Sequence, residues 1–201
     1  MHKPAPSEFP IHELIRERWS PRAFSQKEIP QETLHSLFEA ARWAPSSYNE
    51  QPWAFIIATH NDHENFSKAL EPLVEFNVNW AKHAYLIGFA VAKLAFAKNN
   101  SPNRNAHYDT GAAMAYLTME ATSRGLFVHQ MAGFDPDTAR EVFRIPAGWE
   151  AIAAFAVGYP GDPASLPPPY RDGEIAPRSR KPMREFVMSG KWGHTATFIS
   201  K

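Results

Sequence analysis

One stretch of this chain is apolar on both of its faces, and it limits the folds that the chain can adopt. The stretch is "HAYLIGFAVA", residues 83–92, which lacks the polar alternation of a half-exposed strand. A strand of this kind must be covered on both sides, so it is typical of a sheet buried between two layers. A buried helix is the alternative that the pattern leaves open.

The rest of the chain mixes strand and helix patterns without a strict alternation. Bulky residues with period-two alternation predict strands over residues 52–60 and 150–160. The chain has 201 residues, 44% of them hydrophobic, so we expect one α+β domain over residues 1–201. Apolar residues at helical spacing predict five helices, over residues 10–18, 30–43, 62–76, 108–124 and 135–145.

The chain changes character near its C-terminal end. Six prolines lie between residues 160 and 177, which predicts an extended surface segment. The tail that follows regains apolar and aromatic residues. A tail of this composition is expected to dock on another surface.

Charge and cysteine content exclude several classes of function. The 21 Lys and Arg residues balance the 21 Asp and Glu residues, so we expect no nucleic-acid or membrane partner. The absence of cysteine excludes disulfides, thiolate metal sites and cysteine nucleophiles. No run approaches the roughly 18 apolar residues of a membrane span, and no leader pattern follows the first residues. A cytoplasmic location is therefore expected.

Common catalytic motifs are absent as well. His60 and His63 lie three positions apart, but no HExxH motif occurs and no third ligand is near, so we expect no metal site. The sequence contains no GxSxG, GxGxxG or P-loop motif, which argues against a serine hydrolase, a Rossmann site and a P-loop. Helix capping explains the pair Asp135 and Asp137 better than catalysis does.

Two polar features remain. The loop "APSSYNEQP", residues 44–52, holds uncharged hydrogen-bonding side chains between two prolines. Such groups can match the carbonyl and N–H groups around the edge of a planar ring. Two basic clusters, "RERWSPR" at residues 16–22 and "RSRK" at residues 178–181, combine arginines with serine, as phosphate sites do. On spacing alone, solvated basic patches are the favoured interpretation of both clusters.

The loop and the clusters together suit one ligand, flavin mononucleotide (FMN), which joins a phosphate to a flat ring with a polar edge. At this point the chain resembles the FMN-dependent nitroreductase family. Residues 61–105 match the family poorly. The pieces that match, in the family's order, are "RWSPRAF", "EAARWAPSSYNEQPWAFIIA", "DTGAAMAYLTMEATSRGL", "HQMAGFD", "AVGYPGDP" and "RSRKP".

The resemblance implies a nitroreductase-like α+β fold, with a central, mainly antiparallel sheet flanked by helices. It also implies an intertwined homodimer with FMN at the interface. In that arrangement the C-terminal segment 160–201 extends and packs on the partner subunit. The expected dimer rests on this resemblance.

The same resemblance assigns the cofactor-binding residues. One basic cluster at each end of the chain would bind the phosphate and the ribityl chain, and Arg22 would lie near the flavin N1 and C2 carbonyl. The partner subunit's loop would cover the ring, and two backbone N–H groups would face N5 and the C4 carbonyl. The residues expected to bind FMN are Arg18, Ser20, Arg22, Pro45, Ser46, Ser47, Asn49, Gln51, Ala132, Gly133, Arg178 and Arg180.

The roles of four other residues each have two possible interpretations. Tyr48 and Phe134 are candidates for stacking on the substrate, and packing in the core or at an interface is the alternative for each. An asparagine on a helical segment contacts the ring edge in some family members, and either Asn77 or Asn79 could do so here.

The implied activity is a two-step reduction. NADH or NADPH would give a hydride to flavin N5, and an electron-poor acceptor such as a nitroaromatic or a quinone would then take it. No catalytic side chain is expected, because the flavin carries the chemistry. A flavin storage or sensor protein is one alternative. Another flavin chemistry, either dehydrogenation of a small metabolite or breakdown of the flavin, is the other.

Overall fold

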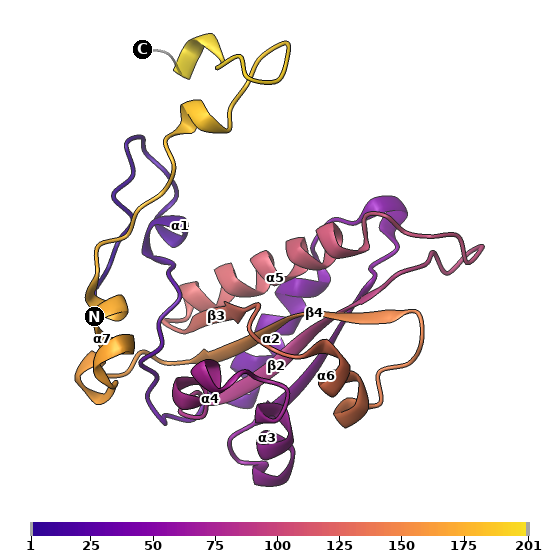
Figure 1. Ribbon diagram of the computed structural model, residues 1–201, viewed down its shortest axis with the longest axis vertical. Coiled ribbons are helices and arrows are strands. Elements are labelled where there is room, and N and C mark those ends of the chain that lie inside the picture. Colours follow the sequence, from indigo (N-terminus) through magenta and orange to yellow (C-terminus); the bar gives the residue numbers. More distant parts are fainter. Residues whose placement is uncertain (1, 200–201) are drawn as a thin grey trace.

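The computed structural model describes residues 2–199, and within them the centre of the molecule is one antiparallel sheet (Figure 1). The strand order is β1–β2–β4–β3, and each neighbouring pair is antiparallel. This confirms the predicted α+β class with an antiparallel sheet. The strands are β1 (Trp53–Thr59), β2 (Leu86–Lys93), β3 (Phe127–Met131) and β4 (Trp149–Gly158).

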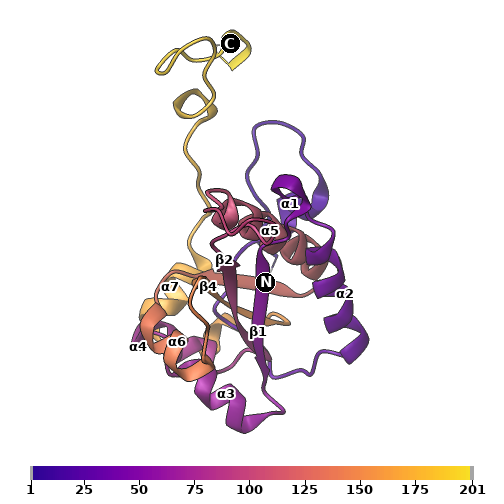
Figure 2. The ribbon, with the colours of Figure 1, turned by 90° about the vertical axis from the view of Figure 1, so that its right-hand side faces the viewer.

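Strand β2 lies between β1 and β4, as its two apolar faces predict. Leu86 and Ala90 belong to one core cluster, whereas Ile87 and Phe89 belong to the other. Helices cover both faces of the sheet (Figure 2). The covering helices are α2 (Gln31–Arg42) and α5 (Ala106–Ser123) on the first face, and α3 (His63–Leu70), α4 (Glu75–Ala81) and α6 (Pro136–Phe143) on the second.

Two elements of the core differ from the sequence prediction. Residues 62–76 form α3 and the start of α4 rather than one helix, because Pro72 has no backbone N–H with which to continue the first helix. Leu73 forms a β-bridge with Phe134 at this break. Strand β3 was missed because it is short and because His129 and Gln130 interrupt its apolar pattern.

Helix α7 (Pro168–Ile175) forms where the prolines predict an extended segment. Pro167 precedes the helix and Pro168 opens it, at positions where the missing N–H would have no partner within the helix. Here the structure differs from the prediction because proline clusters can begin a helix as well as prevent one.

The two ends of the chain run together beside the sheet. The short helix α1 (Glu13–Glu17) lies in the N-terminal segment, and residues 176–182 pass next to that segment (Figure 1). Residues 183–199 project from the body of the molecule (Figure 2). Among residues 2–199, no helix combines the length and the apolar character needed to cross a membrane.

Packing at the centre of the sheet requires a glycine at one position. Gly88 of β2 lies opposite Phe155 of β4, and the Phe155 ring occupies the space that a side chain at position 88 would need. A Cβ atom at this position would approach the ring Cε1 atom to 2.8 Å. Because Phe155 is fully buried, the ring has no free space to move into.

We therefore expect Gly88→Ala to lower the free energy of unfolding by about 1–3 kcal/mol, the range for overpacking a core. Phe155→Leu in the same chain should recover part of this loss, since the smaller side chain frees the space. Urea unfolding of the two single variants and the double variant measures the coupling. Additive losses would contradict the proposed contact.

Candidate functional site

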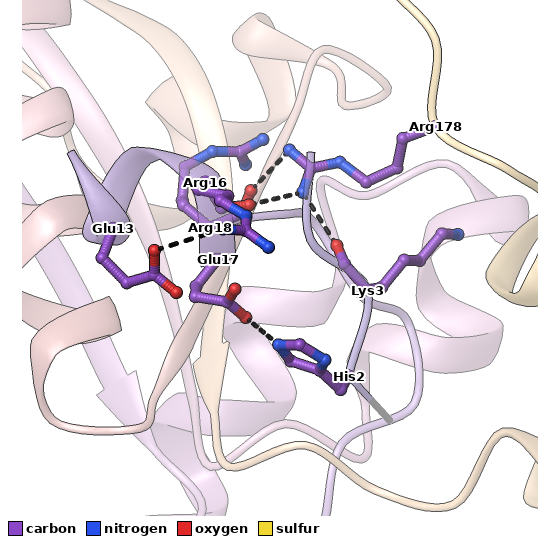
Figure 3. A network of polar contacts seen from close by, with 7 residues as sticks. All are labelled: His2, Lys3, Glu13, Arg16, Glu17, Arg18 and Arg178. Carbon is purple, nitrogen blue, oxygen red and sulfur yellow. Dashed lines mark hydrogen bonds and ion pairs between the residues drawn. The ribbon is translucent and has the colours of Figure 1, made fainter. Parts of the chain in front are cut away.

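Arg178 joins the two ends of the chain. Its Nη1 donates to the carbonyl oxygens of Lys3 at 2.8 Å and Arg16 at 3.0 Å, and its Nη2 donates to the carbonyl of Arg18 at 2.8 Å (Figure 3). Two of these carbonyls lie at the C-terminal end of α1, where a helix leaves its carbonyls without partners. The guanidinium therefore fixes the N-terminal segment against the C-terminal one.

A cluster of positive charge surrounds this junction. Burial, followed by the nearby charges of Arg178 and Arg180, lowers the pKa of Arg18 from its ordinary value. The pKa of Arg178 is lowered in the same way, by burial and then by Arg180, although the Glu17 carboxylate partly offsets this. Arg18 also donates to the Ser20 hydroxyl at 3.3 Å. Mutually repelling cations beside a hydroxyl form a site that favours an anion.

This cluster lines a cavity of about 490 Å³ between the two terminal segments. The charged lining residues are four cations and one carboxylate, and most of the others are apolar, Phe9 and Phe186 among them. The charged residues are Arg18, Arg178, Arg180, Lys181 and Glu8. A cavity of this size with an excess of cationic groups in an apolar lining suits a small organic anion.

Arg22 lies farther along the same segment. Its Nε atom is buried and has no hydrogen-bond partner within the described part of the chain. The guanidinium carbon lies 5.7 Å from the centre of the Phe76 ring. Since a buried guanidinium N–H is costly to leave unpaired, this atom is a candidate donor to a ligand.

Asn77 of α4 lies against the loop that follows β3. Its Nδ2 donates to the Gly133 carbonyl at 2.9 Å, and the Val74 amide donates to the same oxygen at 3.1 Å. A Cβ atom on Gly133 would lie 2.7 Å from Asn77 Nδ2, so only glycine permits this contact. Asn79 instead donates to the Tyr170 hydroxyl at 3.2 Å. Of the two asparagines left open by the sequence, Asn77 is the one beside Gly133.

The polar loop after α2 is strained and firmly anchored. Tyr48, Asn49 and Gln51 all have positive φ, which is unfavourable for residues other than glycine. The backbone N–H of Gln51 donates to the Ser46 hydroxyl at 3.0 Å, and the Gln51 side-chain Nε2 donates to the Asn49 carbonyl at 3.1 Å. These hydrogen bonds stabilise the unfavourable backbone conformation of the loop.

Asp109 in the first turn of α5 provides a further anchor for this loop. Its carboxylate is buried and accepts a hydrogen bond from the Ser47 amide at 3.0 Å. The loop therefore lies at the N-terminal end of α5. Trp19, in contrast, packs against Phe127, the first residue of β3, at a ring distance of 5.9 Å. The Arg18–Arg22 segment thus lies near the other end of α5.

The loop and the basic cluster are therefore far apart within one chain (Figure 1). The 18 residues of α5 span about 27 Å, at 1.5 Å per residue. A single flavin-sized ligand cannot contact both features of the same chain. The sequence predicts both as parts of a binding site, but one chain does not bring them together.

Comparison with known proteins is consistent with this geometry. The model of the nitroreductase family matches residues 15–159. The chain belongs to the nitroreductase family. The match includes Arg18, Arg22, Asn77 and Gly133, and it ends before α7 and Arg178.

Relatives of this nitroreductase-family chain cover most of its length. A crystal structure described as an oxidoreductase containing FMN superposes with a TM-score of 0.89 at 34% identity, covering 95% of this chain and 97% of the other. A candidate NADH dehydrogenase/NAD(P)H nitroreductase of Stenotrophomonas maltophilia is 26% identical over 174 residues, which are 79% of this chain and 88% of the relative. The 5,6-dimethylbenzimidazole synthase of Rhodospirillum rubrum is 25% identical over 177 residues, covering 77% and 83% of the two chains.

The two predicted stacking residues have different surroundings in this family member. Tyr48 is 93% exposed, and its closest aromatic partner is Phe96, at a ring distance of 6.0 Å. Phe134 packs beside the buried Phe89 at 5.6 Å, which is the core-packing alternative. A role for either side chain in substrate binding stays a prediction.

Sequence reasoning missed three residues that hold the site in place. Asp109 could have been found as a carboxylate just before the small apolar residues of its helix. Glu174 gave no signal, because it lies in a stretch that the prolines mark as surface. His129 gave none either, since a histidine in a short segment is more often exposed than structural.

His129 supports the backbone next to Arg22. Its Nδ1 lies 2.8 Å from the Pro21 carbonyl oxygen, so Nδ1 carries the proton that is donated, and its ring packs 4.4 Å from that of Trp80. Burial lowers the pKa of His129 to about 4, with smaller contributions from the positive charges of Arg22 and Arg18, although the bond to Pro21 opposes the shift.

Between pH 6.5 and 4 the unfolded chain binds a proton at this histidine that the folded chain does not bind. Stability should therefore fall as the pH falls through this window. His129→Asn keeps a donor for Pro21 without titrating, so it should remove up to about 3 kcal/mol of the acid-induced loss.

Urea unfolding at several pH values between 4 and 7 measures this difference. His35→Asn, at an exposed histidine of α2, is the matched control and should keep the pH dependence of the parent. Equal pH dependence in the parent and the His129 variant would contradict the assignment.

Proposed function

We propose that this chain is an FMN-dependent oxidoreductase that uses NADH or NADPH to reduce electron-poor acceptors such as nitroaromatics and quinones. The observation that carries the proposal is the buried Nε of Arg22, which has no partner among residues 2–199 and lies four positions from Arg18 and its cation cluster. A ring with a carbonyl edge and a phosphate would satisfy both features.

The cation cluster supports binding of the FMN phosphate. Arg18, Ser20 and Arg180 offer charged and hydroxyl donors around one site. Arg178 has three of its N–H bonds engaged with backbone carbonyls, so its contribution to the phosphate is mainly charge. Arg180 is the better candidate for a direct contact, because among residues 2–199 its guanidinium donates only to the neighbouring Ser179 carbonyl.

Three groups support binding of the flavin ring. Arg22 offers a cation and a free N–H, as the resemblance assigns for the N1 and C2 carbonyl edge. The Gly133 amide donates no backbone hydrogen bond among residues 2–199, which leaves it free for the ring. Asn77 fixes the Gly133 carbonyl and so restrains the loop that carries this amide. These residues fit FMN.

A homodimer would complete the site. The loop of residues 45–51 lies too far from the basic cluster of its own chain, so a second copy must supply the loop that covers the ring. The exposed aromatic residues of the projecting C-terminal segment, Phe186, Trp192 and Phe198, support packing of residues 160–201 on that copy.

When bound, FMN would accept a hydride at N5 from the reduced nicotinamide and pass it to the acceptor in a second, separate step. The side chains bind and orient the reactants. Arg22 would favour the negative charge that reduction places near N1, so it would raise the reduction potential of the bound flavin. Val74 and Phe76 are both about half exposed beside Gly133 and Arg22, and they offer an apolar surface to an acceptor.

An absorbance spectrum of the purified protein between about 300 and 550 nm tests the proposal, using protein reconstituted with FMN. Anaerobic NADH or NADPH should bleach the flavin bands, and a quinone or nitroaromatic should restore them. Bands that do not bleach would point to a storage or sensor protein. Absence of bands after incubation with FMN would overturn the proposal.

A second flavin chemistry is supported by the relative named 5,6-dimethylbenzimidazole synthase. Product analysis after aerobic reduction separates the two reactions. An intact FMN and a reduced acceptor would support the reductase, whereas consumption of the flavin or of a small metabolite would support the alternative.

Arg180→Ala should weaken binding of FMN but not of riboflavin, which lacks the phosphate. The expected loss for FMN is roughly 10- to 100-fold, from the ~1.5–3 kcal/mol of a hydrogen bond to a charged group. Fluorescence titration of the FMN-free protein measures both ligands. Lys68→Ala, on the distant helix α3, is the control and should bind both as the parent does. An equal loss for riboflavin would contradict a phosphate contact.

A further inference from the structure

The carboxylate of Glu174 holds the backbone at Arg22. It is 2% exposed, and it accepts hydrogen bonds from the Arg22 amide at 3.0 Å and 2.9 Å and from the Ala23 amide at 3.0 Å. A buried carboxylate needs several donors to offset its lost hydration. Here the donors are backbone groups 151–152 positions away in the sequence, so the side chain joins α7 to the segment that carries Arg22.

The Arg22 side chain also contacts α7. A Cβ atom on Gly173 would lie 3.4 Å from Arg22 Nη1, so the bare backbone of the helix leaves room for the guanidinium. Tyr170, one turn earlier, packs its ring 4.7 Å from Phe76, the ring that Arg22 approaches. Helix α7 thus contacts both the backbone and the surroundings of the one guanidinium assigned to the flavin ring.

Lys3 fixes the position of α7 in turn. Its Nζ donates to the backbone carbonyl of Glu174 at 2.5 Å, and its ammonium lies 4.8 Å from the centre of the Trp19 ring. This bond reaches the last turn of the helix without touching the Glu174 carboxylate. Lys3 therefore provides a way to perturb α7 without removing the bonds to Arg22.

We propose that Glu174 is a positioning residue that sets the reduction potential of the bound flavin by fixing Arg22. The inference rests on the function proposed above, and it assigns to α7 a role in tuning the cofactor. Helix α7 lies outside residues 15–159, so the family match says nothing about this role.

The direction of the effect distinguishes positioning from simple charge. A carboxylate near the ring would by itself oppose the negative charge of the reduced flavin, so neutralising it would raise the potential. Loss of positioning would move the Arg22 cation away and lower the potential. Glu174→Gln keeps the size of the side chain but turns an N–H₂ group toward the Arg22 amide, so the two explanations predict opposite signs.

The experiment measures the midpoint potential of FMN bound to the parent, Glu174→Gln, Arg22→Ala and the double variant. We expect Glu174→Gln to weaken binding of reduced relative to oxidised FMN about tenfold, which lowers the two-electron potential by about 30 mV. In the Arg22→Ala background the same change should not lower the potential. Lys3→Met, which removes the contact with the α7 carbonyl but leaves the Glu174 carboxylate on the Arg22 amide, should lower the potential less than Glu174→Gln does.

A second readout does not need the cofactor. Hydrogen exchange at the Arg22 and Ala23 amides of FMN-free protein should be faster in Glu174→Gln than in the parent and in Lys3→Met. If the parent binds no FMN, the proposed function fails, yet this measurement still tests whether Glu174 fixes the backbone.

Three results would overturn the inference in protein that does bind FMN. They are a rise in potential in Glu174→Gln, an equal change in the presence and absence of Arg22, and unchanged amide exchange. Should Glu174→Gln fail to fold, Gly173→Leu fills the space beside Arg22 Nη1 and improves helix propensity. This variant should lower the potential without lowering the melting temperature, and an unchanged potential would count against the inference.

Discussion

The burial of β2 on both faces is the constraint on which the rest of the structure depends. A strand without a polar face needs a helical layer on each side, and α2 with α5 and α3 with α4 and α6 provide them. Once both faces are covered, polar ligands must bind at the ends of the layers. The loop after α2 and the segment around Arg22 lie at two such ends.

Buried polar groups then fix the geometry of these ends. Each of the three anchors, Asp109, Asn77 and Glu174, hydrogen-bonds to backbone atoms of a segment distant in sequence. Such bonds are costly to break because the partner left behind is also buried. The candidate site therefore consists of ligand-facing groups on loops, held by side chains that come from helices.

The sequence was informative where the signal was local. The apolar stretch 83–92 identified a central strand, and Asp135 with Pro136 marked the start of α6, where the Asp135 carboxylate accepts from the Asp137 amide. Helix α7 was missed because its prolines carry the opposite local signal. The roles of Glu174 and Asp109 arise from contacts across 151–152 and 62 positions, and no periodicity encodes these. The family motifs identified the loop and the basic clusters as parts of a binding site. Only the structure shows how far apart they lie in one chain.

The clamp made by Arg178 has a consequence for the order in which the chain can fold during synthesis. Its partner carbonyls at Lys3 and Arg18 precede it by 175 and 160 positions, so the segment that carries them is synthesised well before Arg178. At roughly 5–20 residues per second, the N-terminal segment is without this partner for about ten seconds or more. Until then the cavity that Phe9 and Ile15 line lacks its C-terminal wall, and a chain that ended before residue 178 would never gain that wall.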